Sequence, residues 1–222
     1  MDTERVRLLL SDLERKLGPH GRVLDGELRA RVVRAHADGG MAEEAVVCIV
    51  LAPPITAENL HALRGSCKER LGFDLPDDYV AFLRRHDGLS VGEVSPEQAV
   101  RMARDPRSFA DHAIQSSVLL REWLGTVVAQ ITRPEGSVSA EGPSILPCYD
   151  RVETGCHAFE FSRTAGCAPR IVDVDGERLW QRSGHEVLAP SFTAWFEAFL
   201  KAGLEPFATK SLLSTASSRT SE

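Results

Sequence analysis

The sequence lacks the features that mark several common classes of protein. Its five cysteines are odd in number and have no dense, regular spacing, unlike the disulfide framework of a small secreted domain. No apolar run approaches the roughly 20 residues that a membrane-spanning helix needs. The first residues contain neither the basic segment nor the apolar core of a signal peptide. We therefore expect a cytoplasmic protein that does not interact with membranes.

Positive charge is also scarce. The formal net charge is -6 and the isoelectric point is about 5.7. Proteins that bind nucleic acid usually carry a basic surface that neutralises phosphates, so nucleic acid is not the expected partner. An acidic balance permits a basic protein partner such as a nuclease, although mild acidity is also ordinary among cytoplasmic proteins.

Sequence motifs of catalysis and of cofactor binding are missing as well. The chain contains no G-x-G-x-x-G motif and no phosphate-binding loop ending in GK[ST]. Two pairs of nearby carboxylates occur. Asp77 and Asp78 belong to the first turn of a predicted helix, where acids favour the helix dipole. Asp173 and Asp175 lead into a predicted turn. We predict no catalytic residue and no cofactor.

One short segment is rich in potential metal ligands and nucleophiles. It contains Cys148, Cys156, His157 and Cys167, but these residues are too widely spaced for the close ligand pairs of a structural zinc site. If 156–161 is a strand, Cys156 and His157 point to opposite faces of the sheet. We predict no metal site, and keep an enzyme with an unrecognised site in 148–167 as an alternative.

Local patterns predict an α+β fold. Caps are expected at Thr56, Gly72 and Ser191, and Pro76 is expected in the first helical position. Residues 134–143 read as a loop, and residues from 209 onward as a disordered tail. The predicted helices cover about 3–17, 26–37 (with Arg29, Arg31 and Arg34 on a solvated face), 56–72, 76–88, 95–104, 108–124 and 191–203. The predicted strands cover 45–51, 126–132, 145–149, 156–161, 170–174 and 177–181, and the last two form a hairpin.

Three segments resemble the SUKH superfamily, which includes bacterial toxin-immunity proteins and fungal cell-wall regulators of the Smi/Knr type. They span 55–88, 145–162 and 191–203, within about two-thirds of the chain. Asp87 stands where the family usually has Asn. The residues that carry the resemblance are Leu75, Pro76, Tyr79, Phe82, Leu83, Asp87, Gly88, Gly155, Ser191, Phe192, Trp195 and Phe199.

The resemblance implies a central, mostly antiparallel sheet packed by an N-terminal helix pair and a C-terminal helix. It also implies a non-enzymatic domain that binds a cognate protein toxin and blocks its active site. A regulatory scaffold is the alternative binding role. The resemblance assigns no partner-binding residue. We divide the chain into a helical extension with one strand (1–54), a SUKH-like domain (55–206) and a tail (207–222). The extension and the 106–143 insertion match no family segment, so we expect the features peculiar to this chain there.

Overall fold

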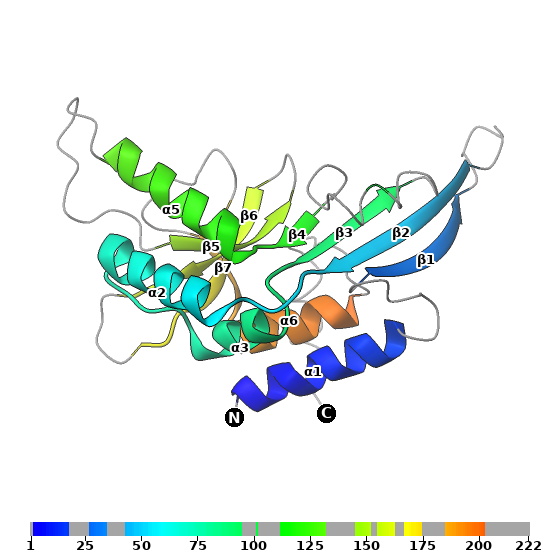
Figure 1. Ribbon diagram of the computed structural model, residues 1–222, viewed down its shortest axis with the longest axis horizontal. Helices are drawn as coiled ribbons and strands as arrows, with labels where there is room; N and C mark the ends of the chain where they lie inside the picture. The colour runs from blue at the N-terminus through cyan, green and yellow to red at the C-terminus, as the bar shows by residue number, and fades with distance from the viewer. Residues whose placement is uncertain are drawn as a thin grey trace, which may run out of the picture.

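Helices and antiparallel strands alternate along the chain (Figure 1). The computed structural model describes residues 2–17, 27–34, 43–94, 101, 112–131, 145–151, 155–162, 167–174 and 185–202. The described helices are α1 (Asp2–Leu17), α2 (Ala57–Leu71), α3 (Asp77–Arg85), α5 (Ser117–Ile131) and α6 (Phe192–Lys201). The described strands are β1 (Glu27–Arg34), β2 (Glu43–Leu51), β3 (Leu89–Val94), β4 (His112–Ile114), β5 (Ile145–Arg151), β6 (Gly155–Glu160), β7 (Arg170–Val174) and β8 (Glu186–Ala189).

The strands form one sheet in chain order, from β1 at one edge to β8 at the other. Every neighbouring pair is antiparallel. Each strand pairs with its predecessor even where helices intervene, as α2 and α3 do between β2 and β3. The predicted α+β class with a central antiparallel sheet is therefore confirmed.

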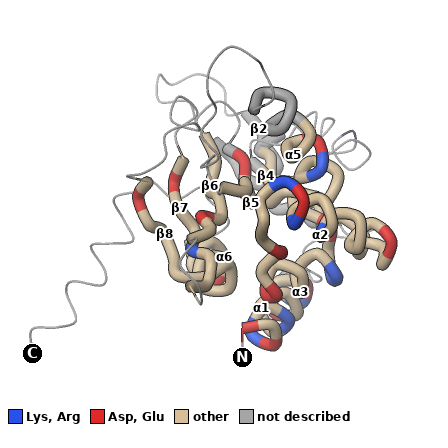
Figure 2. Tube along the Cα trace, turned by 90° about the vertical axis from the view of Figure 1, so that its left-hand side faces the viewer, with Lys and Arg blue, Asp and Glu red and all other residues tan. Residues whose placement is uncertain are grey.

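The helices share one apolar core with the sheet. α1 contacts α3 and α6, and α2 contacts α5. All five described helices contribute buried side chains to the same cluster as strand residues such as Leu146, Phe159 and Ile171. Figure 1 shows β1 and β2 reaching beyond the helices, and Figure 2 shows the molecule from the side. The predicted packing of an N-terminal helix pair and a C-terminal helix against the sheet is confirmed.

Residues that the sequence suggested as caps lie at both ends of α2 and at the N-terminus of α6. Thr56 accepts a hydrogen bond from the Asn59 amide at 3.2 Å and caps α2, and Gly72 ends α2 with a left-handed φ of 78°. Ser191 caps α6 by accepting from the Ala194 amide at 3.2 Å. Pro76 is the N-cap of α3, one residue before the expected position.

The helix predicted over 26–37 is wrong, because Glu27–Arg34 forms strand β1. The segment reads ELRARVVR, in which Leu28, Ala30 and Val32 alternate with charged residues. This period of two fits a strand, and β1 pairs with β2 along its whole length. Arg29, Arg31 and Arg34 therefore belong to an edge strand and not to a helical face.

The region before β5 also differs from the prediction. The helix expected over 108–124 is interrupted, because β4 occupies His112–Ile114 and α5 begins only at Ser117. The strand expected over 126–132 is helical through Ile131. Valines in this stretch suggested a strand, but a helix started at Ser117 continues through them because intrinsic propensities are weak.

Some predicted elements lie outside the described residues. These are most of the 95–104 helix, the 134–143 loop, the 177–181 strand and the tail from 209. Within the described part of the chain, β7 pairs with β6 on one side and with β8 on the other.

Candidate partner-binding site

The three segments that resemble the SUKH superfamily meet in one aromatic cluster. The Tyr79 ring of α3 lies 5.1 Å from Phe159 of β6 and 4.9 Å from Phe192 of α6, measured between centroids. Trp195 lies 5.2 Å from Tyr149 of β5. Further buried residues of the resemblance are Leu75, Phe82, Leu83 and Phe199. Side chains far apart in sequence thus build the centre of the core, where such ring pairs add to the burial energy.

Two polar residues of the resemblance hold the start of α5. The Tyr79 hydroxyl donates to the Gln115 carbonyl at 2.8 Å. The Asp87 carboxylate accepts from the Ser117 amide at 2.7 Å and from its hydroxyl at 2.5 Å. A carboxylate at a helix N-terminus satisfies an otherwise unpaired amide and favours the dipole. Asp87 therefore has a structural role in starting α5.

Glycine is required beside this contact. Gly88 has φ 113°, and a Cβ atom there would lie 3.2 Å from both the Ile114 carbonyl oxygen and the Ser116 Cβ. Gly155 at the start of β6 also has a positive φ, 118°. Both positions need the backbone freedom of glycine.

A buried carboxylate joins two helix N-termini. Asp78 is 7% exposed, and one of its oxygens accepts from the Thr193 amide at 2.9 Å and the Thr193 hydroxyl at 3.0 Å. The other oxygen accepts from the Tyr79 amide at 2.9 Å. The sequence identified Asp78 only as a first-turn acid, because its partner lies 115 residues away. No local pattern could reveal the link.

His157 is part of the core. The Trp195 indole donates to its Nδ1 at 3.0 Å, and both side chains are buried. An indole N–H can only donate, so Nδ1 must accept and the neutral ring carries its proton on Nε2. Nε2 lies 3.9 Å from an oxygen of Asp173 on the neighbouring strand. His157 is thus held in the buried interior by its hydrogen bond with Trp195.

Cys148, Cys156 and Cys167 lie in three different environments. Cys148 belongs to the main core, whereas Cys156 packs with Ala158 and Val172 on the other face of the sheet. Cys167 is exposed. Cys156 and His157 do lie on opposite faces, as alternation predicted. Among the described residues, no group of three or more His, Cys, Asp or Glu side chains is arranged to hold a metal ion.

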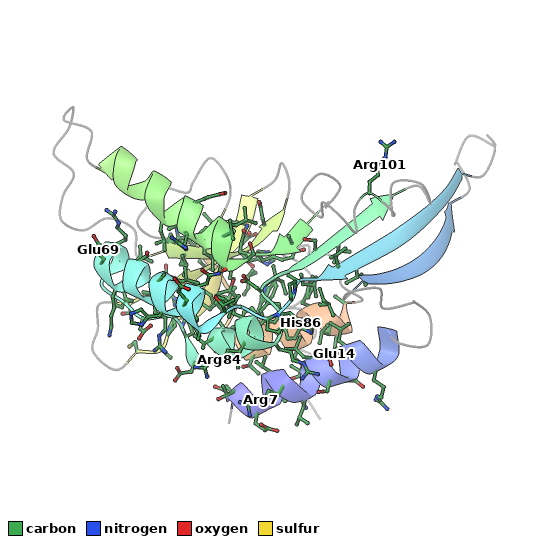
Figure 3. The ribbon with its side chains drawn as sticks, viewed as in Figure 1. Arg7, Glu14, Glu69, Arg84, His86 and Arg101 are labelled. Carbon is green, nitrogen blue, oxygen red and sulfur yellow. The ribbon has the colours of Figure 1, made fainter. Side chains whose placement is uncertain are left out.

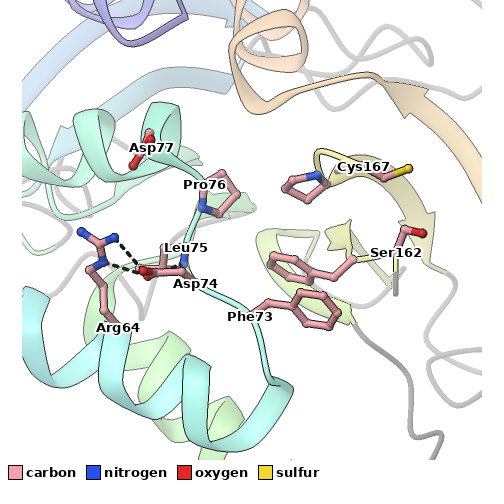
Figure 4. A pocket seen from close by; sticks show the side chains of 10 residues that line it. Arg64, Phe73, Asp74, Leu75, Pro76, Asp77, Ser162 and Cys167 are labelled. Atoms are coloured by element: carbon pink, nitrogen blue, oxygen red, sulfur yellow. Dashed lines mark hydrogen bonds and ion pairs between the residues drawn. The ribbon is translucent and has the colours of Figure 1, made fainter. Parts of the chain in front are cut away.

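A hollow of about 360 Å³ opens beside the Leu75–Pro76 turn (Figure 4). Phe73 and Phe161 stack at 5.0 Å between centroids and form its apolar side. The hollow lies between the α2–α3 connection and two short stretches of chain, one directly after β6 and one directly before β7. Its lining residues are Arg64, Phe73, Asp74, Leu75, Pro76, Asp77, Phe161, Ser162, Cys167 and Pro169.

The hollow has two carboxylates, and only that of Asp74 forms an ion pair with another described residue. Arg64 donates to both oxygens of Asp74, at 2.8 and 2.7 Å, and this lowers the pKa of Asp74. Asp77 is exposed and has no ion pair with another described residue. A basic side chain could lay its apolar stem on the two rings and place its charge near Asp77.

Sequence patterns did not identify this hollow. Leu75 and Pro76 are distinctive in the sequence as the start of a helix that resembles one of the family's, and not as the lining of a hollow. Phe73 follows the end of α2 and stacks on Phe161, which lies 88 positions further on in the sequence. Only tertiary structure brings these rings together.

Comparisons with known proteins leave the family open. No family model matches the chain, and no curated protein matches it. None of the described helices has both the length and the apolar character needed to cross a membrane.

Proposed function

We propose that this chain is a SUKH-type protein-binding domain of the cytoplasm, an immunity protein that neutralises a cognate toxin. The observation that carries the proposal is the aromatic cluster of Tyr79, Phe159, Phe192 and Trp195. Three sequence segments resemble the family separately, and aromatic residues from all three are neighbours in space. This is what a shared core would require.

The chemistry of the motif residues favours binding over catalysis. Tyr79, Asp87 and Ser191 use their polar atoms to hold backbone groups. The hollow beside the Leu75–Pro76 turn has an apolar side and a carboxylate at Asp77. Arginine is enriched among the residues that contribute most to protein interfaces, and such residues cluster in well-packed pockets. In a chain of net charge -6, this supports a basic toxin such as a nuclease.

Co-expression tests the proposed role. The gene next to that of this chain would be expressed in a host whose growth its product inhibits. Protection by this chain, together with a complex that co-purifies in fixed stoichiometry, is the expected result. A complex without growth protection would favour the regulatory scaffold. Neither protection nor a complex would end the immunity proposal.

A further inference from the structure

A second concave surface lies between α1 and α3 and has the opposite chemistry. It is a groove of about 360 Å³ lined by Thr3, Arg7 and Ser11 of α1 and by Ala81, Arg84 and Arg85 of α3. Three of the six lining residues are arginines, and none is an acid. Such a concentration of cations is notable in a chain of net charge -6. Figure 3 labels Arg7 and Arg84 on the two neighbouring helices.

The three guanidinium groups differ in how they are used. Arg85 is bound to Glu14, donating to both carboxylate oxygens at 2.7 and 2.5 Å. Arg7 makes one exposed contact of 3.4 Å with Glu4, which is weak because water competes for both groups. Arg84 is exposed and has no ion pair with another described residue. Arg7 and Arg84 can therefore bind an added anion from two sides.

The walls of the groove are held in place before any ligand arrives. Val6, Leu10 and Leu13 of α1 are buried in the main core. Glu14 also lies 2.8 Å from Nε2 of His86, whose Nδ1 contacts the Ala52 carbonyl at 3.0 Å. Because α1 is fixed on α3, a ligand does not have to order the helix, which lowers the entropy cost of binding.

We propose that this groove binds an acidic segment of a partner protein. A guanidinium fork matches a carboxylate, and two forks on separate helices suit carboxylates spaced along a peptide. Serine and threonine hydroxyls at the rim add hydrogen-bond donors. The net negative charge of the whole chain opposes unspecific binding of such a segment. The inference does not depend on the partner being a toxin. Because α1 lies in the N-terminal extension, the groove is a feature that the extension adds to the family-like helix α3.

The test is an NMR titration of the full chain with a capped hexaglutamate peptide at 0.1 M salt. At that salt, charges beyond about 10 Å are largely screened. We expect saturable shifts concentrated on the amides of Thr3, Arg7, Ser11 and Ala81. Arg84→Glu should weaken binding at least about fivefold, since it converts an attraction into a repulsion. The matched control Arg121→Glu makes the same charge change on α5 and should weaken binding less than about twofold.

Three outcomes would overturn the proposal. One is an absence of saturable binding by the unmodified chain. Another is equal weakening by Arg84→Glu and Arg121→Glu, which would mean that only net charge matters. The third is tighter binding of a single-stranded hexanucleotide with the same dependence on Arg84, which would assign the groove to nucleic acid. Arg84 is exposed, so its variant should melt near the unmodified temperature. Growth protection by the unmodified chain tests the immunity role separately.

Discussion

At the scale of single residues, polar side chains of the resemblance form hydrogen bonds to backbone groups. The Asp87 carboxylate accepts two hydrogen bonds from Ser117. The Tyr79 hydroxyl donates to the backbone carbonyl of Gln115. The sequence showed which residues were distinctive but not whether they acted in folding or at a surface. That distinction depends on partners 30 or more positions away, which no local pattern contains.

Removing the Asp87 carboxylate should destabilise the fold. Asp87→Ala leaves the Ser117 amide without this acceptor, and such a loss costs about 1–2 kcal/mol of unfolding free energy. Ser117→Ala removes only the hydroxyl bond and should cost less. Chemical denaturation of both single variants and the double variant measures the coupling. Strictly additive effects would mean that the bond between the Ser117 hydroxyl and the Asp87 carboxylate contributes nothing.

Cysteine reactivity should report the side-chain environments. Cys167 is exposed, whereas burial raises the pKa of Cys67 to about 12 and that of Cys148 well above its usual range. Because the thiolate is the nucleophile, brief N-ethylmaleimide treatment at pH 7.5 should modify Cys167 and spare both buried thiols. Peptide mass spectrometry locates the label. Labelling of Cys67 as rapid as that of Cys167 would contradict this packing.

At the scale of elements, local signals predicted helices better than they predicted the sheet. α2 and α6 carry side-chain caps in their own sequence, so their N-termini were expected where they occur. β1 was misread because its Arg29 and Arg31 suited a solvated helix face as well as a strand edge. Its pairing with β2 decided the outcome. Strand assignment depends on a partner strand, and that information is not local.

The attachment of α1 should depend on pH. Arg85 and His86 bind Glu14 and lower its pKa from 4.5 to about 2. Because the pKa of Glu14 is lower in the folded state, its ionised carboxylate stabilises the fold at pH values above the ordinary pKa of 4.5. This contribution is lost as the pH falls toward 2. Glu14→Gln should therefore lower the unfolding free energy by about 1–2 kcal/mol at pH 6.5, allowing for partial screening of this pair. The deficit should be smaller at pH 3.5.

Glu69→Gln is the control for this pH dependence. Glu69 is exposed on α2 and has no ion pair with another described residue. Urea unfolding at both pH values should show little effect of this change. A Glu14→Gln deficit that stayed constant between pH 6.5 and 3.5 would show that charge is not its source.

At the scale of the whole molecule, two concave surfaces of opposite charge flank α3. The hollow begins at its N-terminal end with Pro76 and Asp77, and the groove includes its last turn with Arg84 and Arg85. The sequence predicted the α+β class through its caps and apolar periodicity, and the family resemblance implied the packing of the helices on the sheet. It predicted neither surface, since each is assembled from segments that are distant along the chain.

The most direct test of the binding role is a calorimetric titration of this chain with the product of the neighbouring gene. We predict saturable binding at fixed stoichiometry, weakened about tenfold or more by Asp77→Lys, since a reversed charge would face a basic side chain in the hollow. Glu69→Lys, the same charge change outside the hollow, should have little effect. An absence of binding would contradict the proposed role, and equal effects of the two variants would contradict recognition through the hollow.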